Sequence, residues 1–426
     1  MAATKKKRTA GSADRIARAW TRLRRRPEVR ALARLTRRDA NPAWLVGGAV
    51  RDAALGLPIP EIDAAVGRDA EGLAASLERA GFGTAVFLSR DRPGPRVFRV
   101  AGRRTLDLAE IEGGSIERDL LRRDFTANAI AVALEDGRIL DPLGGLSDLS
   151  RRRLRCVDPR NLLEDPLRAL RAARFLATHE LSPDAPTLAA ARRAAPGLRR
   201  VARERIVVEL SRLLEARRAA PALEWAARAG VLPAALGLEL SEAEAARAAR
   251  SLRPLDAPAF RRLPPESRRR LRLARLAGAL GLPPEDTRRW LSGSRIARRE
   301  AEEVARLQTL ARSAGQLLVG VGVHGRRDAV AWLLEAGEAA NDALRLASLS
   351  RRAGTRRGVT RLKRLARIPL RSVAVKGGDV IRWLSLPPGP RVGELLGQLR
   401  LEAALGAVRS RREARDWLAV QVRPRP

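Results

Sequence analysis

The residues with the most specific chemistry lie in the stretch WLVGGAVRDAALGLPIPEID at 44–63. An apolar run ends at the glycine pair Gly47–Gly48, and a short helix is predicted to follow it. Glycines at a strand-to-helix turn let backbone N–H groups approach a phosphate, and the helix N-terminus adds a favourable dipole. Arg51 lies one turn into the predicted helix, where it is placed for a second phosphate contact. The pattern predicts a phosphate-binding turn, although a glycine pair alone is usually only a turn.

Two carboxylates follow this turn. Glu61 and Asp63 are two positions apart on a predicted strand, so their side chains project from the same face. They repel each other unless a cation lies between them, and hard oxygen ligands suit Mg²⁺. An E-x-D pair alone often marks a solvated strand edge. A phosphate cradle followed by a carboxylate pair, however, provides the groups that nucleotidyl transfer requires.

A third carboxylate stands on a later predicted strand. Asp107 is flanked by Leu106 and Leu108, so its side chain faces opposite to theirs. If this strand lies next to the strand of Glu61 and Asp63, Asp107 joins their cluster as a third catalytic carboxylate. An ordinary exposed aspartate on an alternating strand explains the pattern equally well, and the sequence does not choose between the two.

A charged motif, RRDFTANA, occupies positions 122–129. Arg123 is suited to contact a phosphate or sugar, and Asp124 is suited to accept hydrogen bonds from ribose hydroxyls. The pair is therefore predicted to contact the ribose, and Asn128 belongs to the same motif. A charge run on a helix is usually a solvated face, but a motif of this length is unusual by chance.

A second predicted helix carries charged residues in the stretch LLEDPLRALRAARF at 162–175. Asp165, Arg168 and Arg171 follow at i, i+3 and i+6, on one side of that helix. A fixed carboxylate beside a fixed guanidinium complements the pairing edges of cytosine and adenine, whereas guanine and uracil would leave buried polar groups unpaired. The pair could therefore select C and A without a nucleic-acid template. The plainer alternative is a surface ion pair that contributes roughly 0.3 kcal/mol.

These motifs resemble those of the family of class II tRNA nucleotidyltransferases (CCA-adding enzymes) and bacterial poly(A) polymerases. The family patterns are LVGGxVRDxLLG followed by DxD, then RRDFTxNA, DPxGGxxDL, EDxxRxxR and ERIxxEL. This chain carries counterparts of the last three at 141–149, 164–171 and 204–210, and a counterpart of the C-terminal GxDL…PGPxVGxLL pattern at 377–396. The resemblance covers most of the chain and is sparse between about 216 and 370.

The resemblance implies a template-independent enzyme that adds C to the 3′ end of tRNA and releases pyrophosphate, with addition of A left open. It implies that CTP is a substrate, that ATP is an optional one, and that the tRNA acceptor arm is the partner. Glu61 and Asp63 would hold Mg²⁺. The implied nucleotide-binding residues are Gly47, Gly48 and Arg51 for the triphosphate, Arg123 and Asp124 with Asn128 for sugar and phosphate, Asp165 and Arg168 for the base, and Arg171 for phosphate or sugar.

Two departures from the family pattern leave alternatives open. Glu61 stands where the family has Asp, and a misplacement of about 1 Å can cost on the order of 10²-fold in rate. A non-catalytic RNA-binding relative is therefore one alternative. The polar loop that the family ties to the switch from adding C to adding A is reduced here to residues 109–114. Its shortness resembles members that add only two C residues. The other alternative is a poly(A) polymerase, which shares these motifs, and the short loop weighs against it.

The order of predicted elements indicates an α+β fold, in which a small mixed-sheet nucleotidyltransferase head precedes an all-helical neck, body and tail. Two short amphipathic helices are expected from Asp14 and after Pro27, behind a disordered basic arm at 1–12. The expected boundaries are 1–40 for this basic, partly disordered extension, 41–150 for the head, 151–215 for the neck with the base-reading motif, 216–350 for the helical body and 351–426 for the helical tail.

Composition narrows the partners and the compartment. A net charge of +36 over 426 residues indicates a polyanionic partner such as nucleic acid. The lone cysteine, Cys156, excludes an intramolecular disulfide and fits a reducing cytoplasm. Two distant histidines, His179 and His324, argue against a zinc site. No apolar run approaches 18 residues, so no membrane span is expected. The sequence leaves the oligomeric state open.

Overall fold

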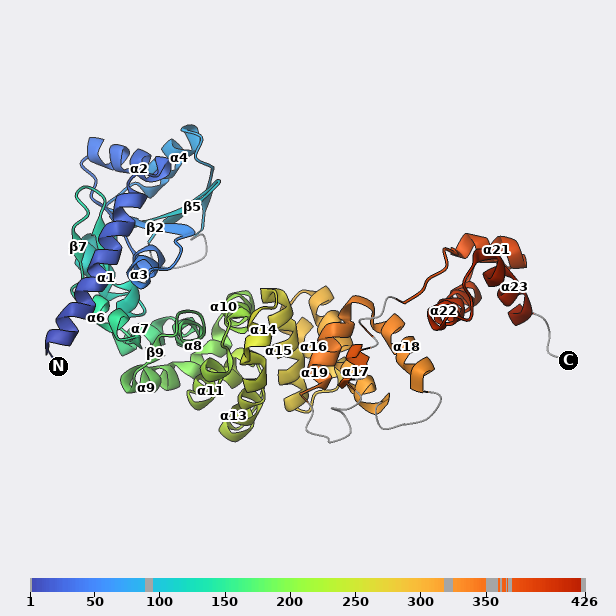
Figure 1. Ribbon diagram of the computed structural model, residues 1–426. Helices are drawn as coiled ribbons and strands as arrows, with labels where there is room; N and C mark the ends of the chain where they lie inside the picture. Colours follow the sequence, from blue (N-terminus) through green and yellow to red (C-terminus); the bar gives the residue numbers. More distant parts are fainter. Residues whose placement is uncertain are drawn as a thin grey trace. The chain divides into compact units, whose positions relative to one another are not determined.

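The computed structural model describes residues 2–88, 95–317, 325–349 and 370–422, together with 359–360, 362–364 and 366. The chain forms two compact units, Met1–Asp256 and Ala257–Pro426, which we describe separately (Figure 1). The division between them falls inside the segment expected to be one helical body. The functions assigned to the extension, head, neck, body and tail, and the boundaries between these segments, stay predictions.

Unit 1 contains a seven-stranded mixed sheet in the order β3-β4-β5-β2-β1-β6-β7. In the described sheet, β2 and β5 pair in parallel and the other neighbours pair antiparallel. Alternation buries Ile62, Leu106 and Leu108 on one face, so that the acidic residues between them project from the other. The strands are β1 (Ala43–Leu45), β2 (Glu61–Val66), β3 (Thr84–Phe87), β4 (Val97–Ala101), β5 (Thr105–Glu110), β6 (Ala131–Ala133) and β7 (Ile139–Leu140).

Short helices cover this sheet and confirm the predicted mixed-sheet head. A buried cluster that includes Val46, Ile116, Leu120 and Ala131 joins one of these helices, α5, to the sheet. The helices are α3 (Gly47–Leu55), α4 (Ala70–Arg79), α5 (Ile116–Leu121) and α6 (Gly145–Ser150), with the short 3₁₀ turns η1 (Glu112–Gly114) and η2 (Thr126–Asn128).

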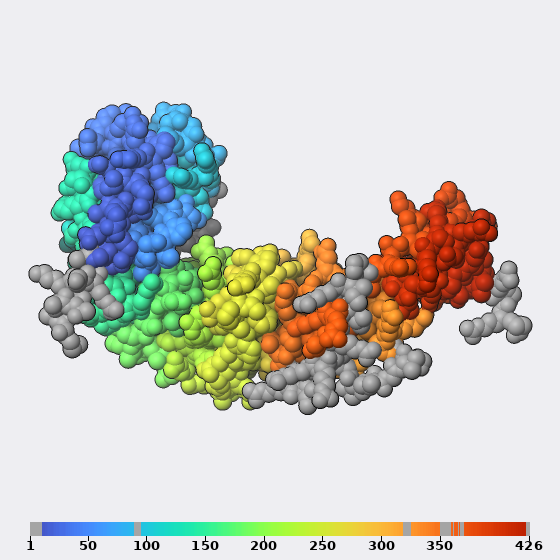
Figure 2. Space-filling model, viewed as in Figure 1, coloured from blue at the N-terminus to red at the C-terminus, as the bar shows by residue number. Residues whose placement is uncertain are grey.

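The N-terminal extension forms two helices, α1 (Ala2–Leu23) and α2 (Pro27–Arg38), as the periodicity predicted. Figure 2 shows residues 11–38, in dark blue, on the surface of the head. Ile16 and Leu23 are buried, and α1 contacts α3 and α6. Residues 2–12, expected to be disordered, belong to α1, because alanine and lysine have high helix propensity and the helix extends from an anchored turn.

The head continues into the helices of the predicted neck. The ring of Phe175 meets Phe125 edge-on at a centroid distance of 5.6 Å, which packs the RRDFTANA motif against α8. One feature differs from an all-helical neck: β8 (Arg153–Leu154) pairs in parallel with β9 (Ser182–Pro183), because α8 ends at the left-handed residue Glu180 and the chain turns back. The helices are α7 (Pro159–Glu164), α8 (Leu167–His179), α9 (Ala185–Ala194), α10 (Arg203–Glu215), α11 (Ala220–Arg228), α12 (Val231–Leu236) and α13 (Glu242–Arg250), with 3₁₀ turns η3 (Ala195–Arg200) and η4 (Arg253–Asp256).

The regular elements described in unit 2 are all helical, as predicted for the body and tail. Several of its helices begin at a proline, which is favourable in the first turn. Across the described residues, no helix is long and apolar enough to cross a membrane. The helices are α14 (Pro258–Arg261), α15 (Pro265–Ala279), α16 (Pro284–Gly293), α17 (Arg298–Leu317), α18 (Gly325–Ala336), α19 (Ala340–Ala347), α21 (Gly377–Leu384), α22 (Pro390–Leu405) and α23 (Arg411–Val422), with the 3₁₀ turn η5 (Gly337–Ala339).

The packing of α1 predicts that the extension is an integral part of the head. We expect Ile16→Ala to lower the free energy of unfolding by about 2–4 kcal/mol, because it leaves a cavity at a fully buried position. Arg18→Ala, at an exposed position of the same helix, is the matched control and should change it by less than about 0.5 kcal/mol. Urea denaturation of the full chain measures both, and equal effects would show that α1 does not pack as described.

Candidate active site

A row of charged side chains crosses three neighbouring strands of the head sheet. Asp63 on β2 pairs with Asp107 on β5, and Asp107 pairs with Arg99 on β4. Residues opposite each other on neighbouring strands project from the same face, so the three side chains lie side by side. Glu61, the exposed first residue of β2, precedes Asp63 by two positions and shares that face. The structure thus brings Asp107 next to the carboxylate pair, a point that the sequence left open.

The Asp63 carboxylate lies in an unfavourable environment for its own charge. Its Oδ2 accepts a hydrogen bond from the Gly48 N–H at 2.9 Å. Burial raises the pKa of Asp63 and the charge of Asp107 raises it further, although the Gly48 N–H, Arg123 and Arg51 oppose the change. A divalent cation beside Asp63 would favour its charged form and so counteract both causes.

The glycine pair keeps open the space in which these charges meet. Gly47 begins α3 with φ +63°, a conformation that side chains rarely adopt. A Cβ at Gly47 would lie 3.2 Å from Asp63 Oδ2 and 3.3 Å from Arg123 Nη1. A Cβ at Gly48 would lie 3.1 Å from the same carboxylate oxygen and 3.6 Å from Arg51 Nη2. A side chain at Gly47 would strain the backbone, and a Cβ at either glycine would require the Asp63 carboxylate to shift by a few tenths of an ångström.

The donor chemistry of the carboxylates fits a hard divalent cation. Glu61 and Asp63 offer oxygen ligands on one face of β2, and the repulsion around Asp63 calls for positive charge. Asp107 instead faces Arg99, whose Nε donates to Oδ1 at 2.8 Å and whose Nη2 donates to Oδ2 at 2.7 Å. Within the described ranges, no group of three or more His, Cys, Asp or Glu side chains is placed to hold a metal ion.

Arg51 connects the glycine turn to the RRDFTANA motif. Its Nη1 donates to Asn128 Oδ1 at 2.9 Å, and its Nε donates to Asp52 Oδ1 at 2.8 Å. The guanidinium lies over the Phe175 ring, 4.9 Å from the centroid, and the side chain is buried. Arg51 and Asn128, both predicted site residues, thus contact each other, while Asp52 extends the chain of contacts to His179 on α8 at 3.2 Å.

Arg123 is oriented by a residue that the sequence interpretation missed. Asp119 on α5 is almost fully buried and accepts hydrogen bonds from Arg123 Nη2 at 2.7 Å and from Arg122 Nη2 at 2.5 Å. Burial acts to raise the pKa of Asp119, but the charges and hydrogen bonds of the two arginines outweigh it and hold the pKa below its ordinary value of 3.8. The i, i+3 and i, i+4 spacing of these residues was the signal that could have indicated the contact.

Asp124 and Arg171 form a pair between the head and α8. Asp124 Oδ1 accepts from the Phe125 N–H and from Asn128 Nδ2, each at 2.8 Å. Its Oδ2 lies 2.9 Å from Arg171 Nη2 but makes no hydrogen bond of acceptable geometry. Burial acts to raise the pKa of Asp124, but Arg171 and the hydrogen bonds hold it below its ordinary value. Contacts of Asp124 with ribose and of Arg171 with phosphate stay predictions.

The residues predicted to read the base are each fixed by other groups. Asp165 Oδ2 accepts from Arg205 Nη2 at 2.9 Å. Arg168 Nη1 donates to the backbone carbonyls of Arg122 at 2.9 Å and Asn161 at 3.1 Å. Asp165 has an extended conformation and precedes α8, so the predicted helical spacing applies only to Arg168 and Arg171. The two reading side chains nevertheless lie on the same short segment, each with its orientation fixed.

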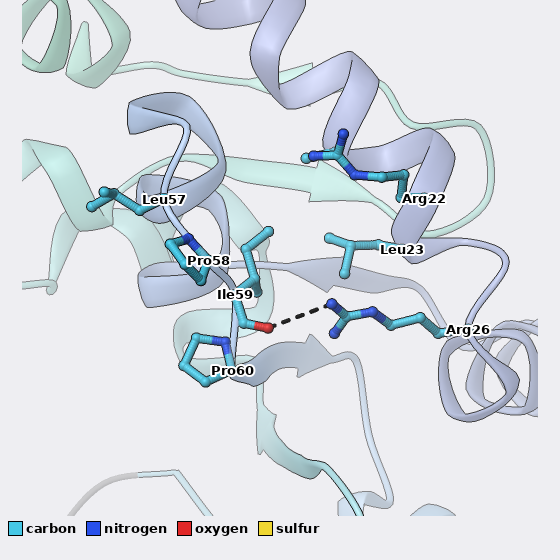
Figure 3. A pocket seen from close by; sticks show the side chains of 8 residues that line it. Arg22, Leu23, Arg26, Leu57, Pro58, Ile59 and Pro60 are labelled. Atoms are coloured by element: carbon cyan, nitrogen blue, oxygen red, sulfur yellow. Dashed lines mark hydrogen bonds between the residues drawn. The ribbon is translucent and has the colours of Figure 1, made fainter.

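Cavities mark other parts of the head. One of about 320 Å³ lies between α1 and the segment that leads into β2, and Arg26 Nη2 donates across it to the Ile59 carbonyl at 3.5 Å (Figure 3). A second, of about 480 Å³, is lined by Trp44 and Arg138 among others. None of the predicted site residues lines either cavity.

Comparison with known proteins identifies the family. A CC-adding tRNA nucleotidyltransferase from Geobacter sulfurreducens is 34% identical over 415 residues, which cover 91% of this chain and 94% of the relative. This chain belongs to the tRNA nucleotidyltransferase family. The family model "Poly A polymerase head domain" matches residues 43–155, and the model "Probable RNA and SrmB- binding site of polymerase A" matches 180–239.

Another relative and two solved structures are also similar to this chain. A CC-adding tRNA nucleotidyltransferase from Synechocystis is 41% identical over 174 residues, 40% of this chain and 41% of the relative. The structure of the Bacillus stearothermophilus CCA-adding enzyme in complex with CTP has a TM-score of 0.71 and 28% identity, over 93% of this chain and 98% of that one. The structure of the Thermotoga maritima CCA-adding enzyme has a TM-score of 0.69 at 19% identity, over 96% and 98%, and supports the fold.

The buried position of Asp119 gives a testable pH dependence. We expect Asp119→Asn to lower the free energy of unfolding by about 3 kcal/mol at pH 7, because two arginines lose their shared carboxylate. The pKa of Asp119 is lower in the folded than in the unfolded chain, so its contribution is complete above the unfolded value and is lost as the pH falls through the folded value. The difference in the free energy of unfolding between wild type and variant should therefore become smaller below about pH 4 in urea titrations. Glu117→Gln, exposed on the same helix, is the control, and a pH-independent gap would contradict this assignment.

Proposed function

We propose that this chain is a Mg²⁺-dependent tRNA nucleotidyltransferase that adds C residues from CTP to the 3′ end of tRNA. The observation that carries the proposal is the assembly of Asp63, Asp107 and the glycine turn in a chain that matches a CC-adding enzyme over 91% of its length. The relatives reported above are named for nucleotide addition to tRNA, which favours this function over a poly(A) polymerase or a non-catalytic RNA-binding protein. The lone Cys156 is buried and fits a reducing cytoplasm.

The reaction is a displacement at phosphorus. The 3′-oxygen of the RNA forms a bond to the α-phosphorus of CTP, the bond from that phosphorus to the bridging oxygen breaks, and pyrophosphate leaves. Bound Mg²⁺ would favour the deprotonated hydroxyl and neutralise charge on the leaving phosphates. Glu61 and Asp63 would hold the metal, with Asp107 as the third acidic group of the site. The Gly48 N–H keeps the Asp63 carboxylate in place for this role.

Positive groups around the glycine turn suit a triphosphate. Gly47 and Gly48 stand at the N-terminus of α3, where the backbone dipole favours negative charge. Arg123, held by Asp119, reaches the space over Gly47. Asp124, whose Oδ2 lies 2.9 Å from Arg171 Nη2, would contact the ribose hydroxyls.

Base selection would rest on Asp165 and Arg168. A carboxylate held by Arg205 and a guanidinium held by two backbone carbonyls present a fixed donor and acceptor pattern. Cytosine and adenine match such a pattern, whereas uracil and guanine would leave its polar groups unpaired. The selection requires no template, because the protein supplies the pairing edge.

The short loop favours addition of C alone. Its residue Glu112 forms an ion pair with Arg122 Nε at 2.9 Å, and the carbonyl of the same Arg122 fixes Arg168. The loop is thus tied to the base-reading arginine through one residue. The relative from Geobacter that covers 91% of this chain is named for CC addition.

Primer extension tests this function directly. We expect the chain to extend tRNA that ends at the discriminator base by two C residues, and tRNA that ends in C by one, with no addition of A. Asp63→Asn should lower the rate by at least about 10²-fold, because it removes the charge that would hold the metal. Asp136→Asn, at an exposed turn, is the control. Addition of A to tRNA ending in CC would contradict the specificity, and no addition at any Mg²⁺ concentration would contradict the function.

Arg205 provides a test of base selection. We expect Arg205→Ala to raise incorporation of U relative to C by about tenfold, because Asp165 loses the guanidinium that holds its orientation. Single-nucleotide incorporation with CTP and UTP in competition measures the ratio. Arg212→Ala, at an exposed position of the same helix, should leave it unchanged. A slower variant with an unchanged ratio would show that Arg205 does not act through the base-reading carboxylate.

A further inference from the structure

Arg99 lies at the end of the acidic row and belongs to none of the motifs. It stands on β4 directly opposite Asp107, which in turn stands directly opposite Asp63. Its guanidinium contacts both oxygens of Asp107, at 2.8 and 2.7 Å, in the parallel two-bond arrangement that is the strongest form of this pair. A cation supplied by the chain itself therefore occupies one side of the carboxylate cluster.

The charge of Arg99 acts on all three carboxylates. The hydrogen bond with Asp107 raises the pKa of Arg99, burial opposes the change, and the charges of Asp107, Glu61 and Asp63 raise it further. The cation is partly shielded, with 37% of the Arg99 side chain and 19% of the Asp107 side chain exposed. Interactions between charges in such a place are screened less than at an open surface.

The neutralisation is incomplete on the side of Asp63. Arg99 contacts both oxygens of Asp107, whereas the Asp63 carboxylate accepts its hydrogen bond from the Gly48 N–H. The row on β2, β5 and β4 holds three carboxylates and one guanidinium, and the charges of Arg123 and Arg51 reach Asp63 from outside the row.

We propose that Arg99 is a positioning residue that holds Asp107 away from direct metal coordination and sets the metal affinity of the Glu61–Asp63 pair. The proposal rests on the proposed function, because it concerns the metal that this function requires. In this arrangement the metal and Arg99 share the neutralisation of the cluster. Arg99 repels the incoming cation and occupies the oxygens of the one carboxylate that could otherwise join its ligands.

A plain cross-strand ion pair is the competing explanation. Such a pair stabilises the sheet and has no effect on a ligand. The two explanations predict opposite changes in metal affinity when Arg99 is removed. If Arg99 only stabilises the sheet, its removal loosens the site and weakens metal binding. If Arg99 opposes the metal, its removal strengthens metal binding.

Mn²⁺ binding to the full chain, measured by electron paramagnetic resonance without nucleotide or RNA, separates these explanations. We expect Arg99→Gln to bind Mn²⁺ about three- to thirty-fold more tightly than the wild type, because a positive charge near the site is removed. Arg99→Lys keeps the charge and should stay within about twofold of the wild type. Arg96→Gln removes a charge near the same strand, where the partner is Glu71, and is the matched control.

Unchanged or weaker Mn²⁺ binding by Arg99→Gln, with an unfolding midpoint close to that of the wild type, would overturn the proposal. If Arg99→Gln is unstable, Arg99→Lys decides through nucleotide addition: a shift of more than tenfold in the Mg²⁺ concentration for half-maximal addition would overturn the proposal, and a shift within twofold would support it. Failure of the proposed function would look different, because the chain would add no C to tRNA whatever the Mn²⁺ affinities. The binding measurement and primer extension thus report on separate conclusions.

Discussion

The repulsion between Asp63 and Asp107 is the constraint on which the rest of the head depends. The parallel, in-register pairing of β2 with β5 places these carboxylates opposite each other. Two like charges directly opposite each other on neighbouring strands are destabilising. The surrounding groups reduce this cost: the Gly48 N–H holds one carboxylate and Arg99 holds the other. A divalent cation would supply the positive charge that is still lacking near Asp63.

The site is built as much by indirect contacts as by its principal residues. Asp119 orients Arg123, Asn128 joins Arg51 to Asp124, and backbone carbonyls hold Arg168. Each of these contacts fixes a long side chain that would otherwise lose conformational entropy when a nucleotide binds. A nucleotide would therefore meet groups that already have their orientation, which is the condition for discrimination between similar bases.

The head and the neck form one site within unit 1. Arg51 of the head lies over Phe175 of α8, Asp124 contacts Arg171, and the short loop reaches Arg168 through Arg122. The glycine turn and α8 are consequently linked by polar and aromatic contacts as well as by the chain.

The sequence alone determined the local parts of this protein: the glycine turn, the alternation that puts Glu61 and Asp63 on one face, the mixed-sheet head and the helical remainder. Each depends on residues only a few positions apart, whose spacing sets the geometry. Only the tertiary structure decided that Asp107 lies beside Asp63, that Arg99 and Asp119 hold site residues, and that Asp165 precedes its helix. Strand order and long-range side-chain pairs depend on how distant segments pack, and no local periodicity records that packing.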